Sequence, residues 1–146
     1  MQSTLKLSQS ISSNTQKVWE VLTKPDHIKT YMFDCDVITN WQIGNPIKWN
    51  LTSDGVSKTL VHGVILEFEE FKKLKYTVFP SESDLNDIPQ NYITIEHLLT
   101  EENGVTLLEL NASDYSKIEN GSKRYEDSVQ GWNYAFPLIK QIAESL

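Results

Sequence analysis

The chain is poor in cysteine and has no long apolar run. Cys35 is the single cysteine among 146 residues, which excludes an intramolecular disulfide. A reducing compartment, the cytoplasm, is therefore the expected location. No apolar run approaches the ~18 residues that a membrane-spanning helix needs, and the first residues lack the apolar core of a signal peptide. We expect neither a membrane protein nor a secreted one.

Basic residues are also scarce. The sequence has 13 lysines and arginines against 20 aspartates and glutamates, which gives a formal net charge of −7 at pH 7. Such a charge repels phosphate backbones and anionic membrane surfaces. The cluster of Lys72, Lys73 and Lys75 is too short to reverse this repulsion. The charge therefore argues against nucleic acid and against a membrane surface as partners.

Motifs for several common chemistries are missing. The three histidines do not occur at metal-ligand spacings, the isolated glycines form no phosphate-binding loop, and no serine lies in a Gly-x-Ser-x-Gly motif. Cys35 has no neighbouring cation or histidine that would activate its thiol. We therefore predict no metal site, no cofactor and no identifiable catalytic residue, and we favour a function other than catalysis.

The composition is nevertheless that of a globular protein. Hydrophobic residues make up 39% of the chain and charged residues 23%, with four tryptophans, six tyrosines and five phenylalanines. A chain of this length buries about two-thirds of its unfolded surface, which supports a core without disulfides or metals. No repeat, low-complexity tract or composition break interrupts it. We predict one domain over residues 1–146.

Two periodicities define the expected elements. Apolar and polar residues alternate, as in strands, over residues 4–12, 47–52, 59–68, 74–78, 92–99 and 105–112, and residues 35–38 form a further short strand-like run. Residues 15–24 and 26–32 favour two short helices, with Pro25 between them. The last segment, 122–146, has an apolar stripe that runs from Tyr125 to Ala143 at helical spacing. Pro137 is predicted to kink this helix without ending it.

This order of elements predicts an α+β fold. Strands joined by hairpin turns form antiparallel sheets, and we expect about six to seven strands. The long C-terminal helix has only the sheet on which to bury its stripe, so a curved sheet should wrap round it. A curved sheet and a helix enclose a concave apolar space, where ligand sites commonly form.

The candidate ligand-binding residues are those whose side chains can point into the apolar space between the sheet and the C-terminal helix. They are one histidine and five aromatic residues at alternating or helical positions: Trp49, His62, Tyr76, Tyr92, Trp132 and Phe136. The aromatic side chains would either line a pocket for a flat or apolar ligand or fill the core. If the side chains of His62, His97 and Glu96 pointed into the cavity, they would favour a catalytic function. Alternation alone does not determine which face of the sheet they occupy. A lysine on the solvent face is the expected partner of Glu96.

Seven short phrases, in their order and spacing, carry a resemblance to a known family. They are SSNTQKVW (12–19), LTKPDHI (22–28), WQIG (41–44), HGVILE (62–67), LKYT (74–77), GVTL (104–107) and GW (131–132). The chain resembles the helix-grip START-like (SRPBCC) superfamily, which includes START lipid-transfer domains, aromatic polyketide cyclases and birch-pollen-allergen proteins. Within it, the sequence is similar to the family of the C-terminal domain of the activator of the heat-shock-protein-ninety ATPase.

The resemblance implies a helix-grip fold over nearly the whole chain and a bacterial source. It implies first the binding of a small hydrophobic or aromatic molecule in the cavity. One alternative is an enzyme of the polyketide cyclase type that acts on a bound substrate. The other is a co-chaperone, whose chaperone partner would be the heat-shock ATPase. The eukaryotic co-chaperone has an additional N-terminal module, whereas here the helix-grip unit is expected to fill the chain. The oligomeric state is not predicted.

Overall fold

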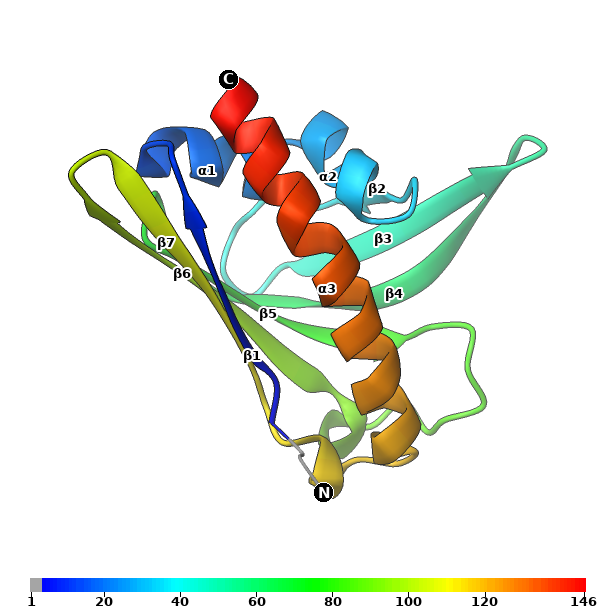
Figure 1. Cartoon of the computed structure of the whole chain (residues 1–146). Coiled ribbons are helices and arrows are strands. Elements are labelled where there is room, and N and C mark those ends of the chain that lie inside the picture. Colours follow the sequence, from blue (N-terminus) through cyan, green and yellow to red (C-terminus); the bar gives the residue numbers. More distant parts are fainter. Residues whose placement is uncertain (1–3) are drawn as a thin grey trace.

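The computed structural model describes residues 4–146 (Figure 1). The strands are β1 (Lys6–Ile11), β2 (Asp36–Ile38), β3 (Pro46–Ser53), β4 (Val56–Glu69), β5 (Lys73–Pro80), β6 (Ile93–Glu102) and β7 (Val105–Ala112). The helices are α1 (Thr15–Thr23), α2 (Pro25–Tyr31) and α3 (Gly121–Ser145). Two short 3-10 turns, η1 (Pro89–Asn91) and η2 (Tyr115–Lys117), lie in the connections around β6 and β7.

The strands form one antiparallel sheet in the order β1-β7-β6-β5-β4-β3-β2. The sheet is curved, and α3 crosses its concave side, while α1 and α2 lie together beside the C-terminal half of α3 (Figure 1). The order and the layers confirm the predicted α+β helix-grip fold. No helix within residues 4–146 is both long and apolar enough to cross a membrane.

Helix α3 buries its apolar stripe unevenly. Trp132, Phe136, Ile139 and Ala143 are buried, whereas Tyr125 and Val129, nearer the start of the helix, are half-buried. Pro137 lies inside the helix on its exposed side, and the helix continues past it to Ser145, as predicted. The C-terminal half of α3 is therefore enclosed by the rest of the protein, and the N-terminal half is enclosed less.

The two short helices account for this unevenness. Asn14 caps α1, because its side-chain oxygen accepts a hydrogen bond of 2.9 Å from the backbone N–H of Lys17. Pro25 is the first residue of α2, where its fixed φ is compatible with a helix and its missing N–H is not needed. Val18, Leu22 and Ile28 on these helices are buried. The sheet is thus covered by three helices at one end and by α3 alone at the other.

Strand β4 departs from the simple alternation. Its pairing with β3 shifts between Trp49 and Asn50, and its pairing with β5 shifts after Ile65. Ile65 is fully buried, whereas its neighbours Val64 and Leu66 are each 37% exposed. The face of β4 that carries His62, Val64 and Leu66 is therefore the outer face over this stretch of the strand.

Strands β4 and β5 approach each other unusually closely at Gly63. A Cβ atom at this position would lie 1.7 Å from the backbone oxygen of Thr77, so a larger residue would clash with backbone. The hydroxyl of Thr77 also accepts a hydrogen bond of 3.0 Å from the backbone N–H of Val64. These contacts fix the two central strands that form the floor of the cavity described below.

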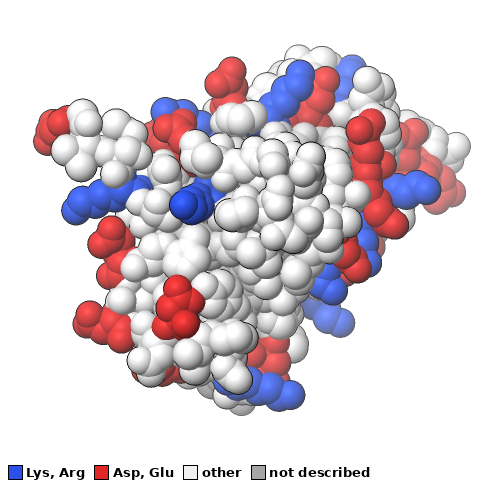
Figure 2. Space-filling model, turned by 180° about the vertical axis from the view of Figure 1, so that it is seen from behind, with Lys and Arg blue, Asp and Glu red and all other residues white. Residues whose placement is uncertain are grey.

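The convex side of the molecule has no continuous basic surface among the described residues. Figure 2 shows acidic and basic side chains interspersed on this side and lying mainly towards its edges.

Candidate ligand cavity

A cavity of about 500 Å³ lies between the central strands and the first half of α3. Most of its wall is apolar or aromatic: Met32, Phe33, Cys35, Trp49, Leu60, Val61, Tyr76, Val78, Phe79, Pro80, Ile95 and Trp132. Arg124, Asp127, Ser128 and Gly131 complete the wall from α3. The side chain of Asp127 is 60% exposed, so the cavity reaches solvent at this end. Small-molecule sites commonly have volumes of about 300–1,000 Å³ and walls of this kind.

Three of the six predicted ligand-binding residues lie together on this wall. Trp49 of β3 and Tyr76 of β5 have ring centroids 5.3 Å apart, and Trp132 faces them from α3. All three are buried, with at most 9% of their surface exposed. The alternation of β3 and β5 and the stripe of α3 were sufficient to bring them together. Their role in binding a ligand stays a prediction.

Phe136 lies behind the wall. Its ring packs against Trp132 with 6.1 Å between centroids, it is 4% exposed, and it is part of the core. It lies one turn further along α3 than Trp132, at the end that α1 and α2 cover. Phe136 therefore supports the orientation of Trp132 and is not one of the residues that line the cavity.

His62 and Tyr92 lie in a polar cluster beside the cavity. His62 Nδ1 is hydrogen-bonded to the Ser81 hydroxyl, and its Nε2 lies 3.1 Å from an Asp87 carboxylate oxygen and 3.0 Å from the Tyr92 hydroxyl. The Tyr92 hydroxyl also donates a hydrogen bond to Asp87. Burial and the nearby Asp87 carboxylate raise the pKa of Tyr92 to about 12, and the same hydrogen bond lowers the pKa of Asp87.

This cluster connects the 81–92 connection to the sheet. The rings of His62 and Tyr92 both pack against Phe79, at 5.5 Å and 5.1 Å between centroids, and Phe79 lines the cavity. The two predicted residues are therefore one layer removed from the cavity. His62 is at an outer-facing position of β4 and Tyr92 immediately precedes β6, and both contact the cavity wall through the ring of Phe79.

His97 lies inside the protein, next to the cavity floor. It is 2% exposed, and its Nε2 lies 3.1 Å from the hydroxyl of Tyr76. Its ring packs edge-on against Trp132 at 5.3 Å. Burial lowers the pKa of His97 to about 4, so its imidazole is neutral at pH 7. Its Nδ1 has no hydrogen-bond partner among the described residues, and the residue lines a small space of about 20 Å³ under α1 and α2.

Glu96 and Cys35, two further residues considered for catalysis, lie in different surroundings. Glu96 lies on the outer face, 3.6 Å from the ammonium of Lys73, and accepts a hydrogen bond from Asn111, which confirms the expected lysine partner. Cys35 is buried on the cavity wall, and burial raises the pKa of its thiol, which keeps it protonated. Within residues 4–146, no group of three or more potential ligands is arranged to hold a metal ion.

Sequence reasoning missed the part of the wall that flanks the stripe of α3. Arg124, Ser128 and Gly131 are spaced like Tyr125, Val129 and Trp132 but shifted by one residue, so their spacing was a usable signal. Phe33 was missed for another reason. It follows α2 in a left-handed backbone conformation, with φ of 53°, which periodicity does not reveal.

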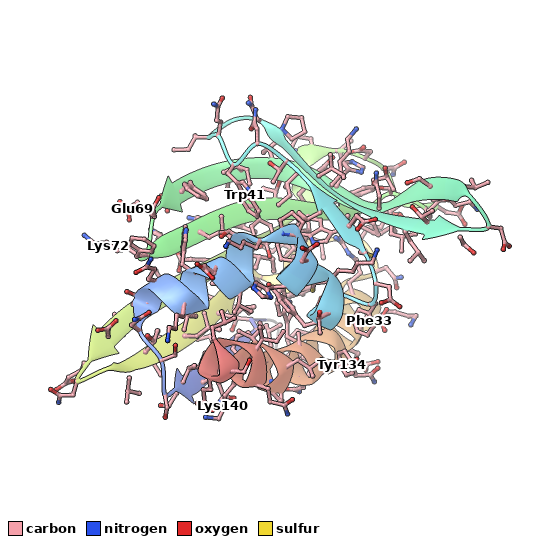
Figure 3. The ribbon with its side chains drawn as sticks, turned by 90° about the horizontal axis from the view of Figure 1, so that it is seen from above. Phe33, Trp41, Glu69, Lys72, Tyr134 and Lys140 are labelled. Carbon is pink, nitrogen blue, oxygen red and sulfur yellow. The ribbon has the colours of Figure 1, made fainter. Side chains whose placement is uncertain are left out.

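Phe33 closes one side of the cavity together with α3. Its ring stacks on Tyr134 at 5.0 Å between centroids, and Figure 3 shows the two labelled side chains next to each other at the end of α2. Both are largely exposed, at 59% and 52%. The gap between α2 and α3 is thus closed by a solvent-facing aromatic pair.

Comparisons with known proteins agree on the family and the fold. The family model described as "Activator of Hsp90 ATPase homolog 1-like protein" matches residues 12–144. The solution structure of ChR145 from Cytophaga hutchinsonii is 30% identical, with a TM-score of 0.75, and the match covers 99% of this chain and 97% of that chain. No curated protein matches the chain.

Two further solved structures share the fold at lower identity. Protein MLL2253 from Mesorhizobium loti is 21% identical, with a TM-score of 0.74 and 97% of each chain covered. PFC0360w, described as an HSP90 activator from Plasmodium falciparum, is 13% identical, with a TM-score of 0.68, and the match covers 92% of this chain and 91% of that one.

Proposed function

The chain belongs to the family of Activator of Hsp90 ATPase homolog 1-like proteins, and from its cavity we propose that it binds one small hydrophobic or aromatic molecule between the sheet and α3. The observation that carries the proposal is the apolar wall of a 500 Å³ cavity inside a chain of only 146 residues. Clefts of this volume with mostly apolar and aromatic walls and a few polar groups are the usual setting of small-molecule sites.

Aromatic rings supply the specificity of this site. Trp49, Tyr76 and Trp132 line the cavity, and Phe79 and Phe33 lie on the same wall. Rings pack favourably in offset and edge-on arrangements, which suits a planar or unsaturated ligand. The hydroxyl of Tyr76 is hydrogen-bonded to His97, which fixes the ring of Tyr76 on the wall. The site thus favours a mostly apolar molecule with few polar groups.

N-phenyl-1-naphthylamine, a neutral apolar dye that fluoresces when it leaves water, tests this proposal. We expect saturable binding of about one dye per chain and a rise in melting temperature, because a ligand that binds only the folded state stabilises it. Trp132→Ala should weaken both signals. Absence of saturable binding to the folded wild-type chain would contradict the proposal.

Filling the cavity provides a sharper test than truncating its wall. Gly131 lies on the wall, and a Cβ atom there would meet only Phe33, at 4.0 Å. Gly131→Leu should therefore occupy the cavity, keep the fold and abolish dye binding. Asn133→Leu places the same side chain on the exposed face of α3 and is the matched control. Equal dye binding by the two variants would place the dye elsewhere on the protein.

A second candidate is an enzyme that acts on the molecule in the cavity, as in the cyclase relatives. Tyr76 and His97 favour it, because they form a buried hydrogen-bonded pair of titratable groups, with Tyr76 on the cavity wall and His97 directly behind it. Tyr76→Phe and His97→Gln would then abolish turnover of a bound substrate without abolishing dye binding. Loss of dye binding in parallel with turnover would indicate a structural role for the pair instead.

A third candidate is a chaperone partner in the cytoplasm, which the similarity to PFC0360w supports. The exposed Phe33–Tyr134 pair offers an apolar contact surface for it. Pull-down of the cognate Hsp90, followed by an ATP turnover assay, tests this role. A lack of stimulation at saturating protein would exclude it.

A further inference from the structure

The only arginine of the chain lies on the cavity wall. The other basic residues are lysines, and Arg124 is in the first turns of α3, where its side chain is half-buried. Arginine presents a planar fork of N–H donors that matches a carboxylate, whereas lysine presents a point charge. The position of this one residue therefore gives the otherwise apolar cavity a specific anion-binding group.

Two contacts hold the guanidinium in place without neutralising it. Nη1 donates a hydrogen bond of 2.6 Å to the backbone oxygen of Asn91, and Cζ lies 5.9 Å from the centroid of Phe79. Arg124 forms no ion pair with a carboxylate of residues 4–146. Of its five N–H donors, one is given to Asn91 among the hydrogen bonds of residues 4–146. The guanidinium is fixed at the wall and keeps donors for another molecule.

Asp127 is the acidic group on the same wall, and its charge is already compensated. Its carboxylate lies 3.2 Å from the ammonium of Lys123, and both side chains are largely exposed. The Arg124 guanidinium, by contrast, is half-buried, and this partial removal from water lowers its pKa. Arginine stays protonated at neutral pH despite such a shift. A partly desolvated cation of this kind gains most from an anionic partner.

We propose that Arg124 binds the carboxylate of an amphipathic acid whose apolar body fills the cavity between Trp49, Val78 and Trp132. The inference rests on the proposed ligand-binding function and adds the chemical class of the ligand. A single carboxylate matches the guanidinium fork and leaves the Lys123–Asp127 pair undisturbed. A phosphate would carry more negative charge than the single positive charge of Arg124 can balance. The excess negative charge would lie close to the carboxylate of Asp127.

Competition against the neutral dye N-phenyl-1-naphthylamine tests the inference near neutral pH. The competitors are decanoate, decanol and decyl phosphate, which share one apolar chain and differ in the polar end. Arg124→Met keeps the length of the side chain and removes its charge. Lys117→Met is the matched control, because it removes one positive charge from an exposed position outside the cavity.

We expect Arg124→Met to weaken displacement by decanoate about tenfold and to change displacement by decanol by less than about twofold, as for the loss of a charge-assisted hydrogen bond. Lys117→Met should leave both competitors at their wild-type values. Equal effects of Arg124→Met on decanoate and decanol would overturn the inference. A larger loss for decyl phosphate than for decanoate would overturn the choice of a carboxylate.

The same experiment separates the two proposals. If wild-type protein does not bind the dye, the ligand-binding function itself fails. If wild-type and Arg124→Met proteins bind the dye equally and decanoate displaces it equally from both, the cavity binds ligands but Arg124 does not select an acid. Dye binding by Arg124→Met also shows that the variant is folded, so a loss of decanoate binding cannot be attributed to unfolding.

Discussion

The two ends of the concave side differ although they share one sheet and one helix. Under α1 and α2, side chains leave a space of only about 20 Å³. Next to the first half of α3, the same sheet leaves a cavity of about 500 Å³. The stripe of α3 reports the same difference, because Ile139 and Ala143 are fully buried while Tyr125 and Val129 are half-buried. We refer to these ends as the filled half and the hollow half.

The difference shows what makes a cavity in this fold. A curved sheet bends away from a straight helix, and the space between them must be filled by additional elements. In the filled half, α1 and α2 supply Val18, Leu22 and Ile28 for this purpose. In the hollow half, no further helix covers the sheet, and the 81–92 connection is fixed to the outer face of β4 by His62 and Asp87. The space there is left for a ligand.

The largest expected effect comes from truncating matched leucines in the two halves. Leu108 of β7 is fully buried, and Leu60 of β4 is half-buried on the cavity wall. Leu108→Ala should lower the free energy of unfolding by about 4 kcal/mol, because it creates a new void in a packed core. Leu60→Ala should cost about 1–2 kcal/mol, because Leu60 already lacks neighbours on its cavity side. Urea denaturation followed by circular dichroism measures both, and equal costs would contradict the division.

The next largest effect is a pH dependence of the free energy of unfolding, which arises from His97 at the border of the two halves. In the unfolded chain His97 has a pKa near 6.5, whereas in the folded protein burial lowers its pKa to about 4. Between these values the unfolded state takes up a proton that the folded state does not. The free energy of unfolding therefore falls as the pH falls through this window, by up to about 3 kcal/mol.

A double variant isolates this contribution. Tyr76→Phe with His97→Leu removes the titrating group without leaving a buried hydroxyl unpaired, and its stability should fall less between pH 6.5 and pH 4 than that of the wild type. Leu108→Ala, which lowers stability without removing a titrating group, is the control and should keep the wild-type slope. Unfolding in urea at several pH values gives the slopes, and identical slopes for wild type and double variant would refute the burial of a neutral His97.

The smallest expected effect is a gain in stability from a substitution in the hollow half. Gly131 lies in the interior of α3 with open space beyond it, apart from Phe33 at 4.0 Å. Gly131→Ala should raise the free energy of unfolding by about 0.5–1 kcal/mol, because alanine restricts the unfolded chain and favours the helix. Thermal denaturation measures this gain. A loss of stability would show that Phe33 and α3 pack more tightly than the structure indicates.

Periodicity placed three of the six predicted residues on the cavity wall, and the exceptions have specific causes. The alternation in β3 and β5 and the stripe of α3 brought Trp49, Tyr76 and Trp132 to the wall. His62 could not be placed in the same way, because the irregular pairing of β4 decides which of its residues face inwards. Phe136 satisfied the stripe but lies at the end of α3 that other helices cover. Periodicity gives the face of an element and not what lies opposite it.

The sequence by itself determined the elements, their order and the apolar face of each, because these depend on local patterns of two and 3.6 residues. It also determined the exclusion of disulfides, since one cysteine cannot pair within the chain. Only the tertiary structure decided that one half is filled and the other hollow, and that the single arginine faces the hollow one. Those properties depend on sheet curvature and on contacts between distant segments, such as Arg124 with Asn91, that no local pattern encodes.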